Sequence, residues 1–318
     1  MIDSTIVAFK YSDICLIPNK CSVKTRKETD TSVKLGKHTF KVPIVPANML
    51  CTINEYLAHR LSEKGYFYIY HRFGNTLEFC RFAKTEEFLI SISVGVGEKD
   101  YTILNQLKSD SIEPDYITID IAHGHADSVL KMIDKIKSTF SNTFVIAGNV
   151  ATSDGVLFLE KGGADATKIG IGQGKACTTK HKTGFTIPMF TCVQECTQAS
   201  QKPVIADGGI EHNGDIAKAI VAGANMVMAG GVFACLLDSP TLRSDGKVQY
   251  FGSASAQNKA HTGLQRVNIE GATLMLNSED LTYLQKLSEI EEDLQSAISY
   301  SGGKVLNDLR YVTWAVNH

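Results

Sequence analysis

The sequence lacks two features that would place it in a broad functional class. No window of about 18 apolar residues is free of charge, so we expect no membrane-spanning helix. The 32 Lys and Arg residues are balanced by 34 Asp and Glu residues, giving a formal net charge of −2. Because general nucleic-acid-binding proteins carry a basic excess, this balance argues against that class. We therefore expect neither a membrane nor a nucleic acid as a partner.

Paired cysteines are also missing, although the chain contains eight cysteines. None forms a Cys-X-X-Cys pair. Cys192 and Cys196 are four residues apart, but no second pair or nearby His completes a zinc site. The first residues, MIDSTIVAFKYSD, lack the apolar core and the cleavage site of a signal peptide. Together these absences predict a cytoplasmic protein with reduced thiols.

The sequence does contain a regular alternation of two patterns. Short apolar, β-branched runs predict eight strands, at residues 42–48, 66–73, 90–96, 116–124, 143–150, 167–172, 203–209 and 226–231. Between them, apolar residues recur three and four apart, as in helices, at 54–64, 127–138, 153–161 and 213–222. This alternation indicates a parallel sheet covered by helices. Eight such units favour an α/β fold of the (β/α)₈ TIM-barrel type, with a doubly wound open sheet as the alternative.

Two regions lie outside the alternation. Residues 1–41 form an N-terminal extension, and residues 238–318 follow the last predicted strand. The polar, Gly- and Ser-rich segment of about 240–275 is long for a loop, and such loops usually bind ligands or close over them. We predict that it is a flap over the barrel mouth, followed by an amphipathic helix and tail at about 279–318. No linker divides the chain, so we expect residues 1–318 to form a single barrel domain.

The most distinctive stretch is ATKIGIGQGKACTTKHKTG, at residues 166–184. Its glycines allow a backbone to approach a ligand closely. Cys177 lies among basic residues and open N–H donors, where the pKa of a thiol tends to fall and the thiolate becomes a nucleophile. The alternative is a tight turn with a buried structural cysteine. This stretch also makes the connection between the sixth and seventh predicted strands the longest of the series, as expected of a catalytic loop in a barrel.

Other strand ends carry glycine pairs or polar groups. Asp207-Gly208-Gly209 and Gly230-Gly231 follow the seventh and eighth strands, whose loops commonly bind phosphate in barrels. Asp207 could accept hydrogen bonds from ribose hydroxyls or, alternatively, cap a helix. Asn48, His71-Arg72 and Asp120 end the first, second and fourth strands, so they should share one rim. Glu270 in the flap is either a general acid or a solvated surface residue.

These motifs resemble the IMP dehydrogenase/GMP reductase family. The resemblance rests on GIGQGKACTTKHKTG, IADGGI, VMAGGVFA, YFGSAS and DLQSAISYSGG, and it covers nearly the whole chain. It implies a barrel enzyme in which Cys177 attacks C2 of a purine nucleotide. It also implies a homotetramer.

Two features favour the GMP reductase branch of that family. Only residues 74–90 separate the second and third strands, so the regulatory insertion usual in IMP dehydrogenases is absent. The Arg-Tyr pair that IMP dehydrogenases use to activate water is also missing from the flap, where Arg266 precedes Val267. The only such pair is Arg310-Tyr311. The resemblance then implies NADPH-dependent reductive deamination of GMP to IMP.

Three other interpretations remain open. The first is a compact IMP dehydrogenase that oxidises IMP to XMP with NAD. The second is a nucleotide-binding regulator without catalysis, although the intact Cys177, Thr179 and Glu270 argue against it. The third is a phosphate-binding barrel enzyme of other chemistry in which Cys177 is structural.

The resemblance also assigns roles position by position. Cys177 matches the nucleophile, and Thr179 and Glu270 match the pair that protonates departing ammonia. Substrate-binding positions are Asn48, Lys175, Asp207, Gly208, Gly209, Gly230, Gly231, Gly252, Ser253, Ala254, Asn268 and Gly271. Positions on the cofactor side are His71, Arg72, Asp120, Ala122, Gly148, Asn149 and Thr179. Carbonyls of Gly172, Gly174 and Cys177 match those that hold a monovalent cation, expected to be potassium.

Three positions depart from the familiar family pattern. Gln173, Lys175 and Lys180 stand where that pattern has Pro, Ser and Arg. The Ser usually contacts the substrate phosphate, and Lys175 could replace that contact with a charge. Gln173 frees a backbone angle in the cation loop that Pro would fix.

Overall fold

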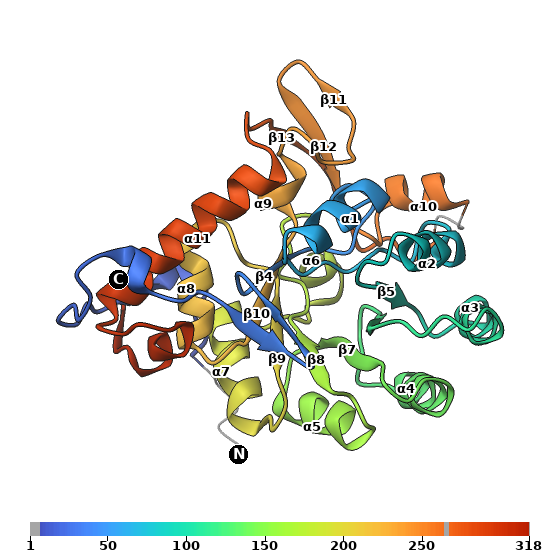
Figure 1. Cartoon of the computed structure of the whole chain (residues 1–318), viewed down its shortest axis with the longest axis horizontal. Coiled ribbons are helices and arrows are strands. Elements are labelled where there is room, and N and C mark those ends of the chain that lie inside the picture. The colour runs from blue at the N-terminus through green and yellow to red at the C-terminus, as the bar shows by residue number, and fades with distance from the viewer. Residues whose placement is uncertain (1–6, 264–266, 318) are drawn as a thin grey trace.

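A curled parallel sheet forms the centre of the computed structural model, which describes residues 7–263 and 267–317. Its order is β4-β10-β9-β8-β7-β6-β5, so the first of these strands pairs with the last in sequence. That pairing curls the sheet, as Figure 1 shows, and excludes an open doubly wound sheet. The strands are β4 Ile44–Pro46, β5 Ser91–Val94, β6 Tyr116–Asp120, β7 Phe144–Val150, β8 Ala166–Ile169, β9 Val204–Asp207 and β10 Met226–Ala229. The predicted TIM-barrel-like fold is therefore confirmed.

The predicted second strand, residues 66–73, is the exception. It joins the sheet by one bridge, between Tyr70 and Ile92, in place of a regular ladder. Ser93 strengthens this attachment because its hydroxyl donates to the Tyr70 carbonyl at 2.8 Å. The hydroxyl of Tyr68 also donates to the Leu89 carbonyl. Side-chain hydroxyls thus supply bonds that a longer backbone ladder would otherwise make, and this part of the strand prediction was wrong.

Helices cover the outside of the sheet (Figure 1). The sequence signals that start them are clear: Asn54 and Thr152 each accept a hydrogen bond from a backbone N–H three residues on. The barrel helices are α1 Glu55–Glu63, α2 Thr76–Thr85, α3 Glu98–Ser109, α4 Asp127–Thr139, α5 Ser153–Lys161, α7 Met189–Ala199 and α8 Asn213–Val221. Two short helices, α6 Thr179–Thr183 and α9 Gly231–Ala234, follow β8 and β10. Within the described ranges, none of the helices is long and apolar enough to cross a membrane.

The remaining elements frame the barrel. Short ones before it are η1 Tyr11–Asp13, β1 Ile14–Leu16, η2 Arg26–Glu28, β2 Val33–Leu35 and β3 His38–Phe40. After β10 come β11 Arg243–Ser244, β12 Lys247–Phe251, α10 Ala256–Thr262, β13 Thr273–Asn277, α11 Tyr283–Tyr300, η3 Leu306–Tyr311 and β14 Trp314–Val316. β14 pairs with β1, so segments from both sides of the barrel sequence lie side by side.

The segment predicted as an irregular flap contains regular structure. β11, β12 and β13 form an antiparallel sheet, and the β11–β12 hairpin projects from the body in Figure 1. Residues 264–266 of the predicted flap, including Arg266, lie outside the described residues. The strands were missed because they are short and partly exposed and lie in a polar, Gly-rich segment.

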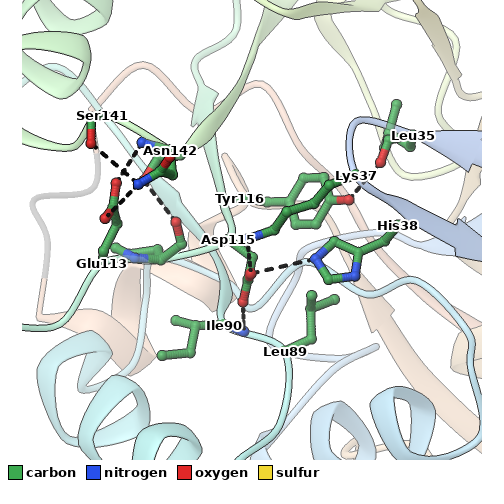
Figure 2. Close-up of polar contacts among 12 residues, drawn as sticks. Leu35, Lys37, His38, Leu89, Ile90, Glu113, Asp115, Tyr116, Ser141 and Asn142 are labelled. Atoms are coloured by element: carbon green, nitrogen blue, oxygen red, sulfur yellow. Dashed lines mark hydrogen bonds and ion pairs between the residues drawn. The ribbon is translucent and has the colours of Figure 1, made fainter.

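Asp115 closes the floor of the barrel, at the amino ends of the strands. Figure 2 shows its carboxylate between Lys37 and His38 of the β2–β3 hairpin, with Lys37 Nζ at 2.9 Å. The backbone N–H of Ile90 donates to the same carboxylate at 3.0 Å. Burial tends to raise the Asp115 pKa, but Lys37 and the Ile90 amide outweigh it and hold that pKa below its ordinary value. Asp115 therefore ties the hairpin to the sheet as an anion.

We predict that Asp115→Asn lowers the free energy of unfolding at pH 7 by about 1 kcal/mol, because Asn can still accept from Ile90 but carries no charge. A carboxylate with a lowered pKa stabilises above its unfolded pKa, and the contribution is lost as the pH falls through the folded pKa. Thermal unfolding of both proteins should therefore give a Tm difference that is constant from pH 7 to 5 and shrinks below about pH 4. A difference that does not change with pH would contradict the ionic role.

Candidate active site

A cavity of about 1060 Å³ opens at the carboxyl ends of the parallel strands. Its walls come from the loops after β6, β7, β8, β9 and β10 and from the segment around β12 and β13. This is the end at which barrel enzymes carry their active sites. Its volume is at the upper end of the range for ligand pockets, which leaves room for more than one small ligand.

Most of the predicted site residues line this one cavity. The lining includes Cys177, Thr179, Glu270, Lys175, Asp207, Gly208, Gly209, Gly230, Gly231, Gly252, Ser253, Ala254, Gly271, Arg72, Asp120, Ala122, Asn149, Gly172 and Gly174. They come from the ends of β6 to β10, from the segment after Tyr70 and from the flap, so the fold brings together positions that are up to about two-thirds of the chain apart.

Three of these residues form a continuous hydrogen-bonded chain. The Cys177 thiol donates to Thr179 Oγ1 at 3.3 Å, and the Thr179 hydroxyl donates to Glu270 Oε2 at 2.7 Å. All three side chains lie at the cavity wall. The donors point in one direction, from sulfur to hydroxyl to carboxylate, which is the arrangement that moves a proton between a nucleophile and an acid.

Backbone pairing fixes Glu270 in this place. Cys177 and Gly271 form an antiparallel bridge, and the Thr178 N–H donates to the Glu270 carbonyl at 2.8 Å. On its other side, the Glu270 N–H donates to the Ala254 carbonyl at 3.1 Å. The cysteine loop and the flap are thus joined by main-chain bonds, so Glu270 faces the thiol as part of a small sheet-like contact.

A buried ion cluster lies in the wall of the cavity between these loops. Lys168 Nζ contacts Asp120 Oδ1 at 2.9 Å and Asp207 Oδ2 at 2.6 Å, and its side chain is 2% exposed. Burial tends to lower the Lys168 pKa, but the two carboxylates outweigh it and raise that pKa. Lys168 and Arg72 keep the Asp120 pKa lowered in spite of its burial. Lys168 was not among the predicted site residues.

Asp207 keeps one oxygen free of protein donors within the described part of the chain. Its Oδ2 accepts from Lys168 and from Asn149 Nδ2, the latter at 2.9 Å, whereas no donor reaches Oδ1. Asn149 Nδ2 also donates to the Gly170 carbonyl at 2.7 Å. The carboxylate is therefore held from one side, and its other oxygen is available to a ligand in the cavity.

The far side of the cavity is lined by glycines and one lysine. Gly208 and Gly209 both have left-handed φ angles, +104° and +78°, which the turn after β9 requires. A Cβ at Gly230 would overlap the Tyr250 hydroxyl, so glycine there lets Tyr250 approach the turn after β10. Lys175 lies beside Gly231, where an added Cβ would be 3.6 Å from Lys175 Cδ. This corner combines backbone, a hydroxyl and a cation, which suits an anionic group.

Four predicted positions do not reach the cavity lining: Asn48, His71, Gly148 and Asn268. His71 instead stacks on Tyr70, with ring centroids 4.6 Å apart, and burial lowers its pKa to about 4, so it is neutral. Gly148 faces Lys168, whose backbone would collide with a Cβ there. Asn48 is buried directly below the wall residues Ala47 and Met49. The Asn268 carbonyl accepts from Lys259 on α10.

Two residues that sequence reasoning missed are central here. Lys168 lies within a predicted strand, and every residue of that strand is buried. The missed signal was a charged residue inside a strand expected to be buried. Tyr250 lies on β12 within the quoted YFGSAS motif and lines the cavity beside Gly230. Its missed signal was an aromatic hydroxyl next to a glycine-rich turn.

The loop after β8 was predicted to hold a monovalent cation. Gly172 has a left-handed φ of +77°, and the Gly174 carbonyl accepts from the Cys177 N–H at 2.9 Å. Gln173 donates from Nε2 to Thr186 Oγ1 at 2.6 Å, and Thr186 donates onward to the Ile171 carbonyl. Gln173 thus braces the loop from outside through Thr186. Within the described ranges, no cluster of three or more His, Cys, Asp and Glu side chains could hold a metal.

Comparison with known proteins gives a consistent result. Residues 8–316 match the family model described as the IMP dehydrogenase / GMP reductase domain. A GMP reductase of Streptococcus pneumoniae serotype 4 is 50% identical over 317 residues, which cover 97% of this chain and 94% of that protein. GMP reductases of the Streptococcus pneumoniae strains Hungary19A-6 and JJA are similar to the same extent. The match spans the barrel, the cysteine loop and the flap, so the chain belongs to the IMP dehydrogenase/GMP reductase family.

Proposed function

We propose that this protein is a GMP reductase, which converts GMP to IMP and ammonia with NADPH as the reductant. The observation that carries the proposal is the chain from Cys177 through Thr179 to Glu270, within the same cavity as Asp207 and the glycine turns. The chain is 50% identical to proteins named GMP reductase, which supports the same reaction.

The cavity offers a distinct partner for each part of GMP. Asp207 Oδ1 can accept from the ribose hydroxyls. Lys175 and the glycine turns at Gly209 and Gly230-Gly231 surround the position proposed for the phosphate. Gly252, Ser253 and Ala254 then flank the base and bring its C2 toward Cys177.

The relay accounts for the deamination step. The thiol proton passes through the Thr179 hydroxyl to Glu270, which produces a thiolate and a neutral carboxylic acid together. The thiolate attacks C2 of guanine and forms a C–S bond. Glu270 returns the proton, through Thr179, to the exocyclic nitrogen, so the C–N bond breaks and ammonia leaves. The purine remains bound to Cys177 as a thioimidate, and general acid help of this kind typically contributes about 10² to 10⁴ in rate.

The other wall of the cavity suits the cofactor. It is lined by Arg72, Asp120, Ala122, Asn149 and Thr179. The Arg72 Nε and Asn149 Oδ1 atoms are buried and accept or donate no hydrogen bond within the described ranges, although Arg72 Nε lies 4.0 Å from Asp120. Such orphaned polar atoms indicate a polar ligand. When bound there, NADPH supplies a hydride to C2 of the purine. Cys177 then leaves as a thiolate, the C–S bond breaks, and IMP is released.

The alternative activity is IMP oxidation with NAD, which in this family uses an Arg-Tyr pair at the flap. The pair present here, Arg310-Tyr311, lies in η3, where Arg310 donates to the Ala224 carbonyl at 3.1 Å. Ala224 precedes β10, at the amino end of the barrel, so this pair is on the opposite face from Cys177. This position favours the reductase.

Three further features are proposed from the family resemblance. Potassium would be held by the carbonyls of Gly172, Gly174 and Cys177, since rings of carbonyl oxygens suit K⁺. The protein would act as a cytoplasmic homotetramer. Residues 1–318 would form one catalytic domain, with the region of about 240–275 as its flap.

The first test replaces the nucleophile. With NADPH and GMP, absorbance at 340 nm should fall in the wild-type protein, and Cys177→Ala should reduce this turnover by about 10³-fold or more while GMP binding persists. Cys235→Ala is the matched control, because Cys235 lines the same cavity beyond Gly231. Turnover of IMP with NAD in place of GMP with NADPH would instead establish the dehydrogenase.

The second test separates the two chemical steps. Glu270→Gln should slow deamination of GMP by about 10² to 10⁴ because the acid is lost. The partial reaction of IMP with NADP⁺, measured at alkaline pH where hydroxide can take the thiol proton, should change less than about tenfold, because it has no ammonia to protonate. Glu289→Gln, in another part of the cavity, controls for loss of a carboxylate. Equal loss in both reactions would contradict the role of Glu270 as the acid.

The third test concerns the cation. Replacing K⁺ by Li⁺ at constant ionic strength should lower turnover by about tenfold or more, since Li⁺ is too small to satisfy several loop carbonyls together. Equilibrium binding of GMP, measured in parallel, should change less, because Asp207 and the phosphate corner lie outside that loop. Equal turnover in both salts would contradict a K⁺ requirement.

A further inference from the structure

A charged lysine lies at an unusual place, in the middle of a buried parallel strand. Every residue of β8 is buried, and Lys168 is the only ionisable one among them. Taking an ammonium group out of water is strongly unfavourable unless it is paired. Its pairing with both Asp120 and Asp207 meets that requirement, and this cluster connects β6, β8 and β9.

The sheet makes room for this lysine. Lys168 is in register with Gly148 on β7 and Ile205 on β9, so it points to the same face as Asp120 and Asp207. A Cβ at Gly148 would collide with the Lys168 backbone. A glycine inside a strand is unfavourable by itself. At position 148 it allows β7 to pack closely against Lys168.

The two carboxylates depend on Lys168 unequally. Asp120 also lies 4.0 Å from Arg72 Nε, so it has a second cation. Asp207 forms an ion pair with no other Lys or Arg side chain in the described ranges. Loss of Lys168 would therefore leave Asp207 as the unpaired anion, close to the buried Tyr250, whose own pKa is raised by burial and by the charges of Cys51, Asp207 and Cys177.

We propose that Lys168 is a positioning residue for substrate specificity: by binding Asp207 at Oδ2 it leaves Oδ1 open to the cavity, and so gives the site its preference for ribonucleotides. This proposal rests on the proposed function, because it takes Asp207 as the partner of the ribose hydroxyls. An ionised acceptor makes stronger hydrogen bonds to hydroxyls than a neutral one. Lys168 would thus set hydroxyl recognition without contacting the nucleotide.

The test compares GMP with 2′,3′-dideoxyguanosine 5′-monophosphate, which lacks both hydroxyls. Equilibrium binding to the wild-type protein should favour GMP by about 10- to 100-fold. In Lys168→Met, where Asp207 Oδ2 loses its ammonium partner, the preference should fall to less than about threefold. The groups facing this carboxylate are Lys168, Asn149, Tyr250 and, beyond Asp120, Arg72. In steady state, KM for GMP should rise more than KM for NADPH, because Asp120 retains Arg72.

Three further variants exclude a merely structural effect. Lys168→Arg should restore much of the preference, since the charge is retained. Lys218→Met removes another partly buried lysine, which pairs with Asp215 at 3.3 Å outside the cavity, and should leave the preference intact. In an Asp207→Asn background, Lys168→Met should have no further effect on the preference. That double variant also lacks the unpaired carboxylate, so it should fold even if Lys168→Met alone does not.

A ligand-free measurement separates failure of this proposal from failure of the proposed function. In Lys168→Met the Asp207 carboxylate would lose its ion-pair partner, so thermal unfolding without ligand should occur at a lower Tm than in the wild type. The same substitution in the Asp207→Asn background should recover part of that loss. Absence of GMP binding in the wild type would overturn the proposed function. An unchanged nucleotide preference in Lys168→Met, or a Tm equal to that of the wild type, would overturn the role of Lys168.

Discussion

The ion pairs of Lys168 with Asp120 and Asp207 are the constraint around which the cavity is arranged. A parallel barrel normally fills its interior with apolar side chains, whereas here charged side chains of β6, β8 and β9 meet. A buried ion pair is weak evidence for stability, because desolvation offsets the attraction. Here the ion pairs fix the positions of two carboxylates from separate strands in one wall of the cavity. Asp207 lies toward the proposed nucleotide substrate and Asp120 toward the proposed cofactor.

A second constraint comes from main-chain pairing between the cysteine loop and the flap. Lids are usually drawn from the less stable parts of a protein, where few bonds must break for the lid to open. The contact here is short, with one bridge at Cys177 and Gly271 and bonds on either side of Glu270. A few hydrogen bonds are enough to place the carboxylate beside Thr179. Because the same bonds join the two segments and place Glu270, any separation of the flap from the cysteine loop would also break the relay.

The sequence predicted the barrel well because its signals are local. Asn54 and Thr152 cap helices, and strands such as residues 203–209 are apolar runs between glycine turns, so each unit can be recognised without its neighbours. The cavity could also be foreseen, since strand ends in a parallel barrel share one rim. The flap strands and the role of Lys168 could not be predicted, because both depend on residues far away in the sequence. β13 forms by pairing with β12, and a buried lysine is stable only where carboxylates of other strands contact it. His71 shows the opposite case, a residue that the sequence placed in the site and the structure does not. It stacks on Tyr70 and does not line the cavity.

The polarity of the relay explains how one set of residues can serve two needs that are usually met separately. A thiol nucleophile needs a base to take its proton, and an amine leaving group needs an acid to supply one. Cys177 donates to Thr179 and Thr179 donates to Glu270. In the proposed mechanism, the proton that leaves the sulfur is therefore the one that Glu270 returns to the departing nitrogen. The net charge of the site is the same before and after this transfer. A single carboxylate is therefore sufficient, and the cavity needs no separate base for the thiol.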